Sequence, residues 1–166
     1  MSDSSIIGLF DFISYKIEKI NLVMNPQAGF LLNNSYIKPE NAELSIMLRN
    51  TEKFIIDGRI IYIGGLSTKI VLTDEKTHNQ IMNGEFGISG AFTPVGTVDE
   101  TAEQNFTKIN LPALLMPYMR AAMTNTLASA GFGTVLFPLV NIYELARNTQ
   151  TQLVDHTIPP SPGEKI

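Results

Sequence analysis

The sequence predicts an α+β fold: a four-stranded antiparallel β-meander followed by one long and one short C-terminal helix. As far as Phe92, apolar residues recur at alternate positions in several stretches, which is the period of half-buried strands. After Asn110, dense apolar runs begin at residues that commonly cap helices. A long segment without periodicity follows the first strand, so we expect a crossover loop there.

The first strand is expected over Phe12 to Met24. Its apolar residues are Ile13, Tyr15 and Ile17, followed by Ile20, Leu22 and Met24. The change of phase at Glu18 and Lys19 predicts a bulge. Asn25 and Pro26 end the strand, because proline has no N–H for a ladder.

The crossover loop is expected from Asn25 to Asn41. It carries Phe30, Leu31, Leu32 and Tyr36 among Asn, Gly and Pro residues. A loop of this length in a compact domain is uncommon and is often functional. These apolar side chains either line a binding surface or pin the loop to the core.

Three further strands complete the predicted meander. The first runs from Leu44 to Ile56, and Asp57-Gly58 then favours a two-residue hairpin turn with positive φ. The returning arm runs from Arg59 to Leu72, where Gly64-Gly65 predicts a bulge or a strong local bend. The last strand is expected over Gln80 to Phe92.

The two helices follow a polar connector. Asn110 is the expected N-cap of the long helix, with Pro112 in its first turn, and Gly131 is expected just beyond its C-terminus. Asn141 is the expected N-cap of a short helix over Ile142 to Leu153. We therefore expect one domain over residues 1–154 and a disordered, proline-containing tail over residues 155–166.

The long helix is apolar around nearly its whole circumference. Such a helix has to be covered on more than one side. The cover is either another subunit or the C-terminal helix folded back. The first alternative predicts an oligomer interface made by Leu115, Tyr118, Met119, Ala121, Ala122 and Asn125.

Composition argues against several classes of function. A net charge of −4 is unfavourable for binding a phosphate backbone, so no nucleic-acid partner is expected. Without cysteine there is no disulfide and no thiolate. His78 and His156 have no ligand or carboxylate at catalytic or metal-binding spacing, so we expect no enzyme activity, metal or cofactor. With no signal peptide or long apolar run, the expected location is the cytoplasm, without membrane insertion.

The order of three motifs resembles the SecB export-chaperone family. These are Met116-Pro117-Tyr118-Met119-Arg120, the hinge glycine Gly131, and Pro138-Leu139-Val140-Asn141-Ile142-Tyr143. The resemblance extends from about Phe12 to Arg147. It implies an ATP-independent holdase that binds unfolded preproteins and passes them to SecA, and a homotetramer in which the long helices pack at the subunit interface.

The resemblance also implies a client groove between the crossover loop, the sheet and the second helix with its preceding link. In this chain the groove would comprise Phe30, Leu31, Leu32, Tyr36, Phe137, Leu139 and Val140. The chain departs from the family in two places used for SecA, since its tail has little negative charge and its sheet is only modestly acidic. The alternatives are a SecB-like chaperone dedicated to one partner, such as an antitoxin, and a small-molecule binding or structural protein with the same fold.

Overall fold

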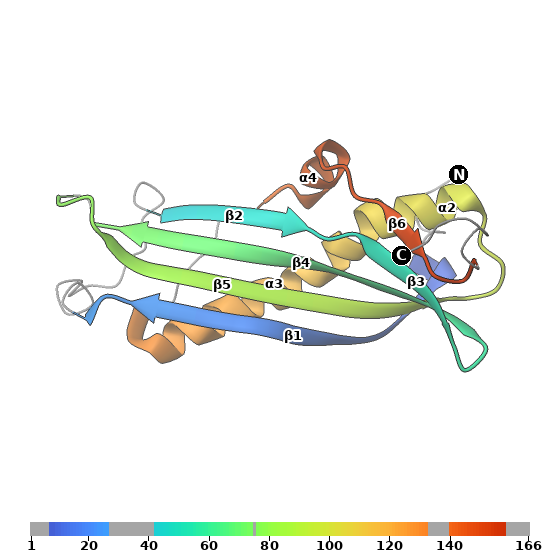
Figure 1. Ribbon diagram of the computed structural model, residues 1–166, viewed down its shortest axis with the longest axis horizontal. Coiled ribbons are helices and arrows are strands. Elements are labelled where there is room, and N and C mark those ends of the chain that lie inside the picture. Colours follow the sequence, from blue (N-terminus) through green and yellow to red (C-terminus); the bar gives the residue numbers. More distant parts are fainter. Residues whose placement is uncertain (1–6, 27–41, 75, 133–139, 159–166) are drawn as a thin grey trace, which may run out of the picture.

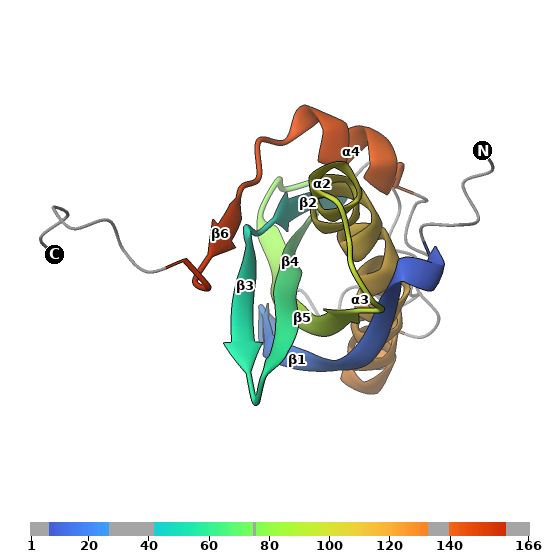
Figure 2. The same cartoon turned by 90° about the vertical axis from the view of Figure 1, so that its right-hand side faces the viewer.

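The computed structural model describes residues 7–26, 42–74, 76–132 and 140–158. Figure 1 shows a long, twisted sheet with helix α3 lying lengthwise across one face. The end-on view in Figure 2 shows two layers, with the sheet on one side and the helices on the other. No helix in the described ranges is long and apolar enough to cross a membrane.

The sheet has six strands and not the four that were predicted. Their order is β1-β5-β4-β3-β6, with β2 also paired to β4. The bounds are Phe10–Met24 (β1), Ala42–Leu48 (β2), Thr51–Ile56 (β3), Arg59–Thr73 (β4), Gln80–Pro94 (β5) and Leu153–Asp155 (β6). All pairs are antiparallel except β3 with β6.

Two features account for the extra strands. The single strand expected over 44–56 is divided at Arg49 and Asn50, where the register with β4 shifts by one residue. The Arg49 side chain donates from this break to the Ile88 carbonyl oxygen at 2.8 Å. The helix expected to reach Leu153 ends at Asn148, and the chain then pairs with β3 as β6. Asp155 therefore belongs to the sheet, although a tail was expected to begin there.

The predicted turn and the bulge in β1 are confirmed, and a register shift also occurs at the glycine pair. Asp57 and Gly58 have φ values of 52° and 74° in the β3–β4 hairpin. The register of β1 with β5 shifts between Ile17 and Lys19, as the change of phase predicts. Opposite Gly64 and Gly65 the register of β4 with the preceding strands shifts by one residue, from Leu48–Leu66 to Glu52–Ile63, while its register with β5 is continuous. These two glycines also provide room for other side chains.

The helical region begins earlier than predicted. Asp99, not Asn110, is the N-cap, and its side chain accepts a hydrogen bond from Ala102 N. The helical elements are α2 (Glu100–Asn105), the π-helical segment η3 (Phe106–Asn110), α3 (Leu111–Leu127), the π-helical segment η4 (Ala128–Phe132) and α4 (Ile142–Asn148). A 3₁₀ turn, η2 (Ile7–Leu9), precedes β1. Gly131 has the expected positive φ, 97°, and Asn141 caps α4 as expected.

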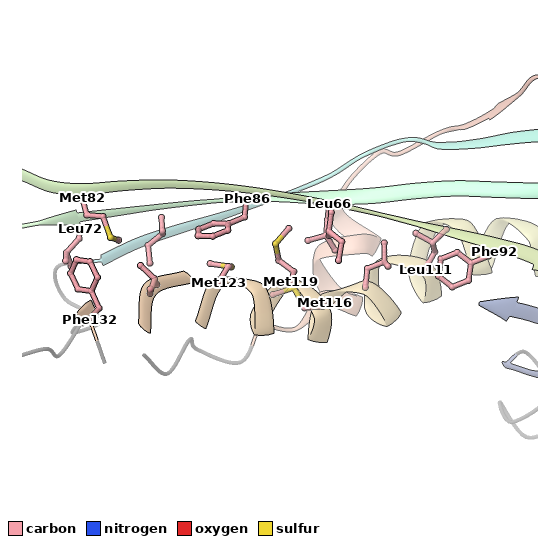
Figure 3. Packing of buried hydrophobic residues seen from close by; sticks show 14 of the residues in the cluster. Leu66, Leu72, Met82, Phe86, Phe92, Leu111, Met116, Met119, Met123 and Phe132 are labelled. Atoms are coloured by element: carbon pink, nitrogen blue, oxygen red, sulfur yellow. The ribbon is translucent and has the colours of Figure 1, made fainter. Parts of the chain in front are cut away.

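The core lies between α3 and the inner face of β4 and β5 (Figure 3). Residues spaced four apart on α3 are fully buried, namely Leu111, Leu115, Met119, Met123 and Leu127. Gly64 and Gly90 are partners in the sheet, and a Cβ at either would lie 2.6 Å from a methyl carbon of Leu111 or Leu115. The glycine pair thus lets the first turns of α3 approach the sheet closely.

Candidate functional site

Six of the fourteen exposed large apolar side chains of the described chain lie on β1. β1 pairs with β5 along its whole length, and its other edge has no partner strand in the described ranges. Large apolar side chains on both of its faces are exposed. We call this surface the β1 edge, and its members are Phe12, Ile13, Tyr15, Ile17, Ile20 and Val23.

Aromatic side chains connect the β1 edge to α3. The ring centroids of Tyr15 and Tyr118 are 4.4 Å apart, and those of Phe12 and Tyr118 are 5.7 Å apart. All three rings remain partly exposed. The apolar surface therefore continues from the strand onto the outer face of the helix.

A small aromatic pocket lies where the start of β1 meets η3, α3 and α4. Its volume is about 210 Å³. The lining residues, which define the aromatic pocket, are Phe10, Phe12, Phe92, Phe106, Asn110, Ala113, Leu114 and Tyr143. Phe10 stacks on Phe106 with centroids 3.8 Å apart, so the floor is well packed. None of the lining side chains is charged, and Leu114 and Tyr143 are exposed at the rim.

Most of the predicted client groove falls outside the described residues. This applies to Phe30, Leu31, Leu32, Tyr36, Phe137 and Leu139. Val140 is described and half-buried, directly before the cap of α4. The sequence reasoning did not select Tyr143 for the groove. The signal for it was available, since the cap at Asn141 places Tyr143 in the first turn of a helix beside the predicted link.

The six residues predicted to form an oligomer interface separate into two groups. Leu115 and Met119 have no exposed surface because they pack in the core of their own chain. Tyr118, Ala121 and Asn125 are exposed, and Ala122 is half-buried. α4 packs against α3 and η3, so the C-terminal helix supplies part of the second cover. The outward side of α3 is still available to a partner.

The opposite edge of the sheet is covered by the C-terminal segment. β6 pairs with residues 51–53 of β3, and two hydrogen bonds extend the contact, from Thr51 N to the Gln152 oxygen at 3.2 Å and from His156 N to the Lys53 oxygen at 2.9 Å. The His156 ring stacks on Phe54 with centroids 4.5 Å apart. His156 Nε2 also lies 3.2 Å from Glu52 Oε1.

Under this covered edge lies a half-buried charged cluster. Lys53 Nζ is 2.5 Å from Glu103 Oε1 and 3.9 Å from Asp155 Oδ2. The Tyr62 hydroxyl donates to the same Glu103 oxygen at 2.5 Å. Burial, followed by this hydrogen bond, raises the pKa of Tyr62. The Lys53 ammonium group of β3 thus contacts Glu103 of α2 and Asp155 of β6, and connects the three elements.

The described residues contain no group of three or more His, Asp or Glu side chains placed to hold a metal ion. His78 is in the β4–β5 turn with φ of 58° and is exposed, and His156 is engaged at the covered edge. The arrangement of the site is instead that of an apolar binding surface. It has an uncharged aromatic pocket and a strand edge without a partner among the described residues.

No protein-family model matches the sequence, and no curated protein matches it. Among solved structures, the chain is similar to the Mycobacterium tuberculosis Rv1957 SecB-like chaperone in complex with a ChAD peptide from the Rv1956 HigA1 antitoxin. The TM-score is 0.58 at 8% identity, and the alignment covers 83% of this chain and 92% of the other. At that identity the likeness is one of fold. The described chain therefore has a SecB-like α+β fold, with a six-stranded sheet and one long helix across it.

Proposed function

We propose that this protein is an ATP-independent holdase that binds extended apolar segments of other polypeptides. The observation that supports this most is the uncharged aromatic pocket at the end of an unpaired apolar strand edge. A likeness of fold to a chaperone that was solved with a bound peptide supports the same proposal.

The size and chemistry of the aromatic pocket favour a polypeptide client over a small molecule. Pockets for drug-sized ligands have volumes of about 300–1,000 Å³, whereas this one has about 210 Å³. One large apolar side chain is the better match. Its burial is favourable by roughly 25 cal/mol per Å² of apolar surface, whatever the rest of the client sequence. Backbone groups at a strand edge can add hydrogen bonds to an extended segment.

We propose that the remainder of the β1 edge, together with the exposed side of α3, is covered by a second copy of the chain. An exposed apolar strand edge promotes pairing with another chain, and soluble proteins cover or charge such edges. From Ile17 to Val23 the edge lies beyond the aromatic pocket, so assembly and client binding use different parts of it. A tetramer remains the oligomer that the SecB resemblance predicts.

The client is either one dedicated partner or many unfolded proteins. The similar SecB-like chaperone was solved with an antitoxin peptide, which favours a dedicated partner. Delivery of preproteins to SecA in the cytoplasm remains a prediction of the resemblance. Binding of purified SecA to the client-loaded protein, with the free protein as the reference, tests that step directly.

The proposal is tested by light scattering from a chemically unfolded protein that is diluted into increasing amounts of this chain without nucleotide. We expect suppression that saturates at a fixed ratio of client to oligomer. Tyr143→Asp places a charge at the rim of the aromatic pocket, where Tyr143 is 50% exposed. We expect it to weaken suppression about tenfold, which is the loss of one apolar side-chain contact.

Ile55→Asp is the matched control. Ile55 is 59% exposed on the β3–β4 hairpin, away from the aromatic pocket, and the same change of charge there should leave suppression unaltered. Equal loss in both variants would mean that net charge, not the pocket, determines binding. Absence of suppression by the wild type at every ratio would refute a general holdase and leave the dedicated role, which binding to candidate partner peptides would test.

A further inference from the structure

The face of the sheet opposite α3 carries a trough that neither the core nor the aromatic pocket uses. Its volume is about 420 Å³. One row of partners crosses it, with Lys19 opposite Gly87, Gly87 opposite Ser67, and Ser67 opposite Met47. The two central strands, β4 and β5, contribute the two smallest residues of this row, Ser67 and Gly87. A Cβ at Gly87 would meet only Lys19, at 3.4 Å or more, so the space above the floor is open.

Arg49 and Glu18 form one rim of this trough. Arg49 Nη1 lies 2.7 Å from Glu18 Oε2, and its other terminal nitrogen donates to the Ile88 oxygen. The guanidinium rests directly over Gly65, where a Cβ would lie 2.0 Å from Nη2. This rim is therefore held in place by an ion pair, a backbone acceptor and a glycine that has no side chain to displace it.

On the other side of the trough, two lysines, Lys19 and Lys69, lie beside one carboxylate, Glu85. Lys19 forms an ion pair with Glu85, and Lys69 is the partner of Glu85 in the register of β4 with β5. The hydrogen bond from Lys19, then its charge and more weakly that of Lys69, lower the pKa of Glu85. Lys69 forms no ion pair of its own among the described residues and is exposed.

The trough therefore differs in sign from the chain as a whole. Three cationic side chains, Lys19, Arg49 and Lys69, line it against two carboxylates, Glu18 and Glu85, whereas the chain carries a net charge of −4. Its apolar wall is Met47, which is 68% exposed and flexible enough to adapt to different partners. A nucleic acid would bring successive phosphates against both carboxylates, whereas a peptide with one carboxylate at Lys69 uses the single excess positive charge and meets Met47 with an apolar side chain.

We propose that this trough is a docking site for an acidic and apolar segment of a partner protein. A carboxylate of the segment would pair with Lys69, and a neighbouring apolar side chain would lie on Met47 over the floor of Ser67 and Gly87. This surface is on the opposite face of the sheet from the aromatic pocket. The two sites can be tested separately.

The experiment measures fluorescence anisotropy of two labelled ten-residue peptides, one of alternating Asp and Leu and one of alternating Lys and Leu. We expect the Asp-Leu peptide to bind more tightly and to weaken as salt increases. Lys69→Glu should weaken it by about tenfold or more, because it replaces attraction with repulsion. Gly87→Leu fills the trough without changing charge and should have a similar effect.

Two controls separate this site from non-specific effects. Lys76→Glu makes the same change of charge in the β4–β5 turn and should bind the Asp-Leu peptide as the wild type does. Tyr143→Asp removes any share of the peptide's Leu side chains that binds at the aromatic pocket, and Lys69→Glu should lower the affinity by the same factor in that background. Unchanged binding by Lys69→Glu and Gly87→Leu, with native unfolding midpoints, would overturn the proposal. Equal loss in Lys76→Glu would show that only overall charge matters.

Discussion

The two edges of the sheet differ in how they are covered. The β3 edge is covered within the chain by β6, and backbone hydrogen bonds, a stacked histidine and the Lys53 cluster hold the cover in place. The β1 edge has no cover within the described chain, although it is longer and more apolar. The longer and more apolar of the two edges is therefore the one that the described chain leaves open.

Chemistry explains the difference. The short strand β6 is held on its edge by an ion pair between its last residue, Asp155, and Lys53 of β3. An apolar edge gains most from a surface of equal length and character, which a second copy of the same chain provides. On this view the covered edge stabilises the single chain and the open edge serves assembly and binding.

The largest expected effect is on assembly at the open edge. Ile20 is 51% exposed on β1, and Ile20→Arg would place an unpaired charge in the proposed contact between copies. We expect the dissociation constant to rise by about 100-fold, which corresponds to roughly 3 kcal/mol. Sedimentation or light-scattering mass would fall toward that of one chain. Ile55→Arg on the β3–β4 hairpin is the control, and a wild-type mass for both variants would place the interface elsewhere.

An intermediate effect is expected at the covered edge. Lys53→Met leaves Glu103 without its ammonium partner, in a place where both side chains are only 16% exposed. We expect the free energy of unfolding to fall by about 2 kcal/mol. In the double variant with Glu103→Gln, the amide oxygen still accepts from Tyr62, and most of this loss should be recovered. Denaturant unfolding measures both, and equal losses in the single and double variants would contradict a role for the charge.

The smallest effect is a pH dependence at Asp155. The hydrogen bond from the Thr157 hydroxyl, followed by that from the Thr157 N–H, lowers the pKa of Asp155. A lowered pKa stabilises the fold at pH values above the unfolded pKa of about 3.9, and the contribution disappears as pH falls through the native pKa.

Asp155→Asn should therefore destabilise the protein by less than about 1 kcal/mol at pH 7 and by nothing at low pH. Unfolding midpoints of variant and wild type should converge as the pH falls below the lowered native pKa of Asp155. Asp11→Asn, which removes an exposed carboxylate at the start of β1, controls for net charge. A difference that stays constant with pH would mean that the carboxylate form of Asp155 contributes nothing.

Local signals in the sequence predicted several elements because the responsible groups are neighbours in the chain. The alternation in β1 and its bulge, the positive φ at Asp57-Gly58, and the Asn141 cap are of this kind. The N-cap was misplaced because the residues of α2 after Asp99 are mostly polar and show no apolar period, whereas the apolar run begins only after Asn110. The side chain of Asp99 accepts a hydrogen bond from Ala102 N, whereas Asn110 lies inside the helical run and its side chain caps nothing.

Features that depend on distant partners were decided only by the tertiary structure. The break between β2 and β3 lies where their register with β4 shifts, and β6 depends on pairing with β3 about a hundred residues earlier in the chain. The trough requires Lys19, Gly87, Ser67 and Met47 to meet in one row. The sequence by itself determined the strand and helix periods and the apolar character of the β1 edge. Which groups meet across the sheet is a matter of register, and register depends on the packing of the whole domain.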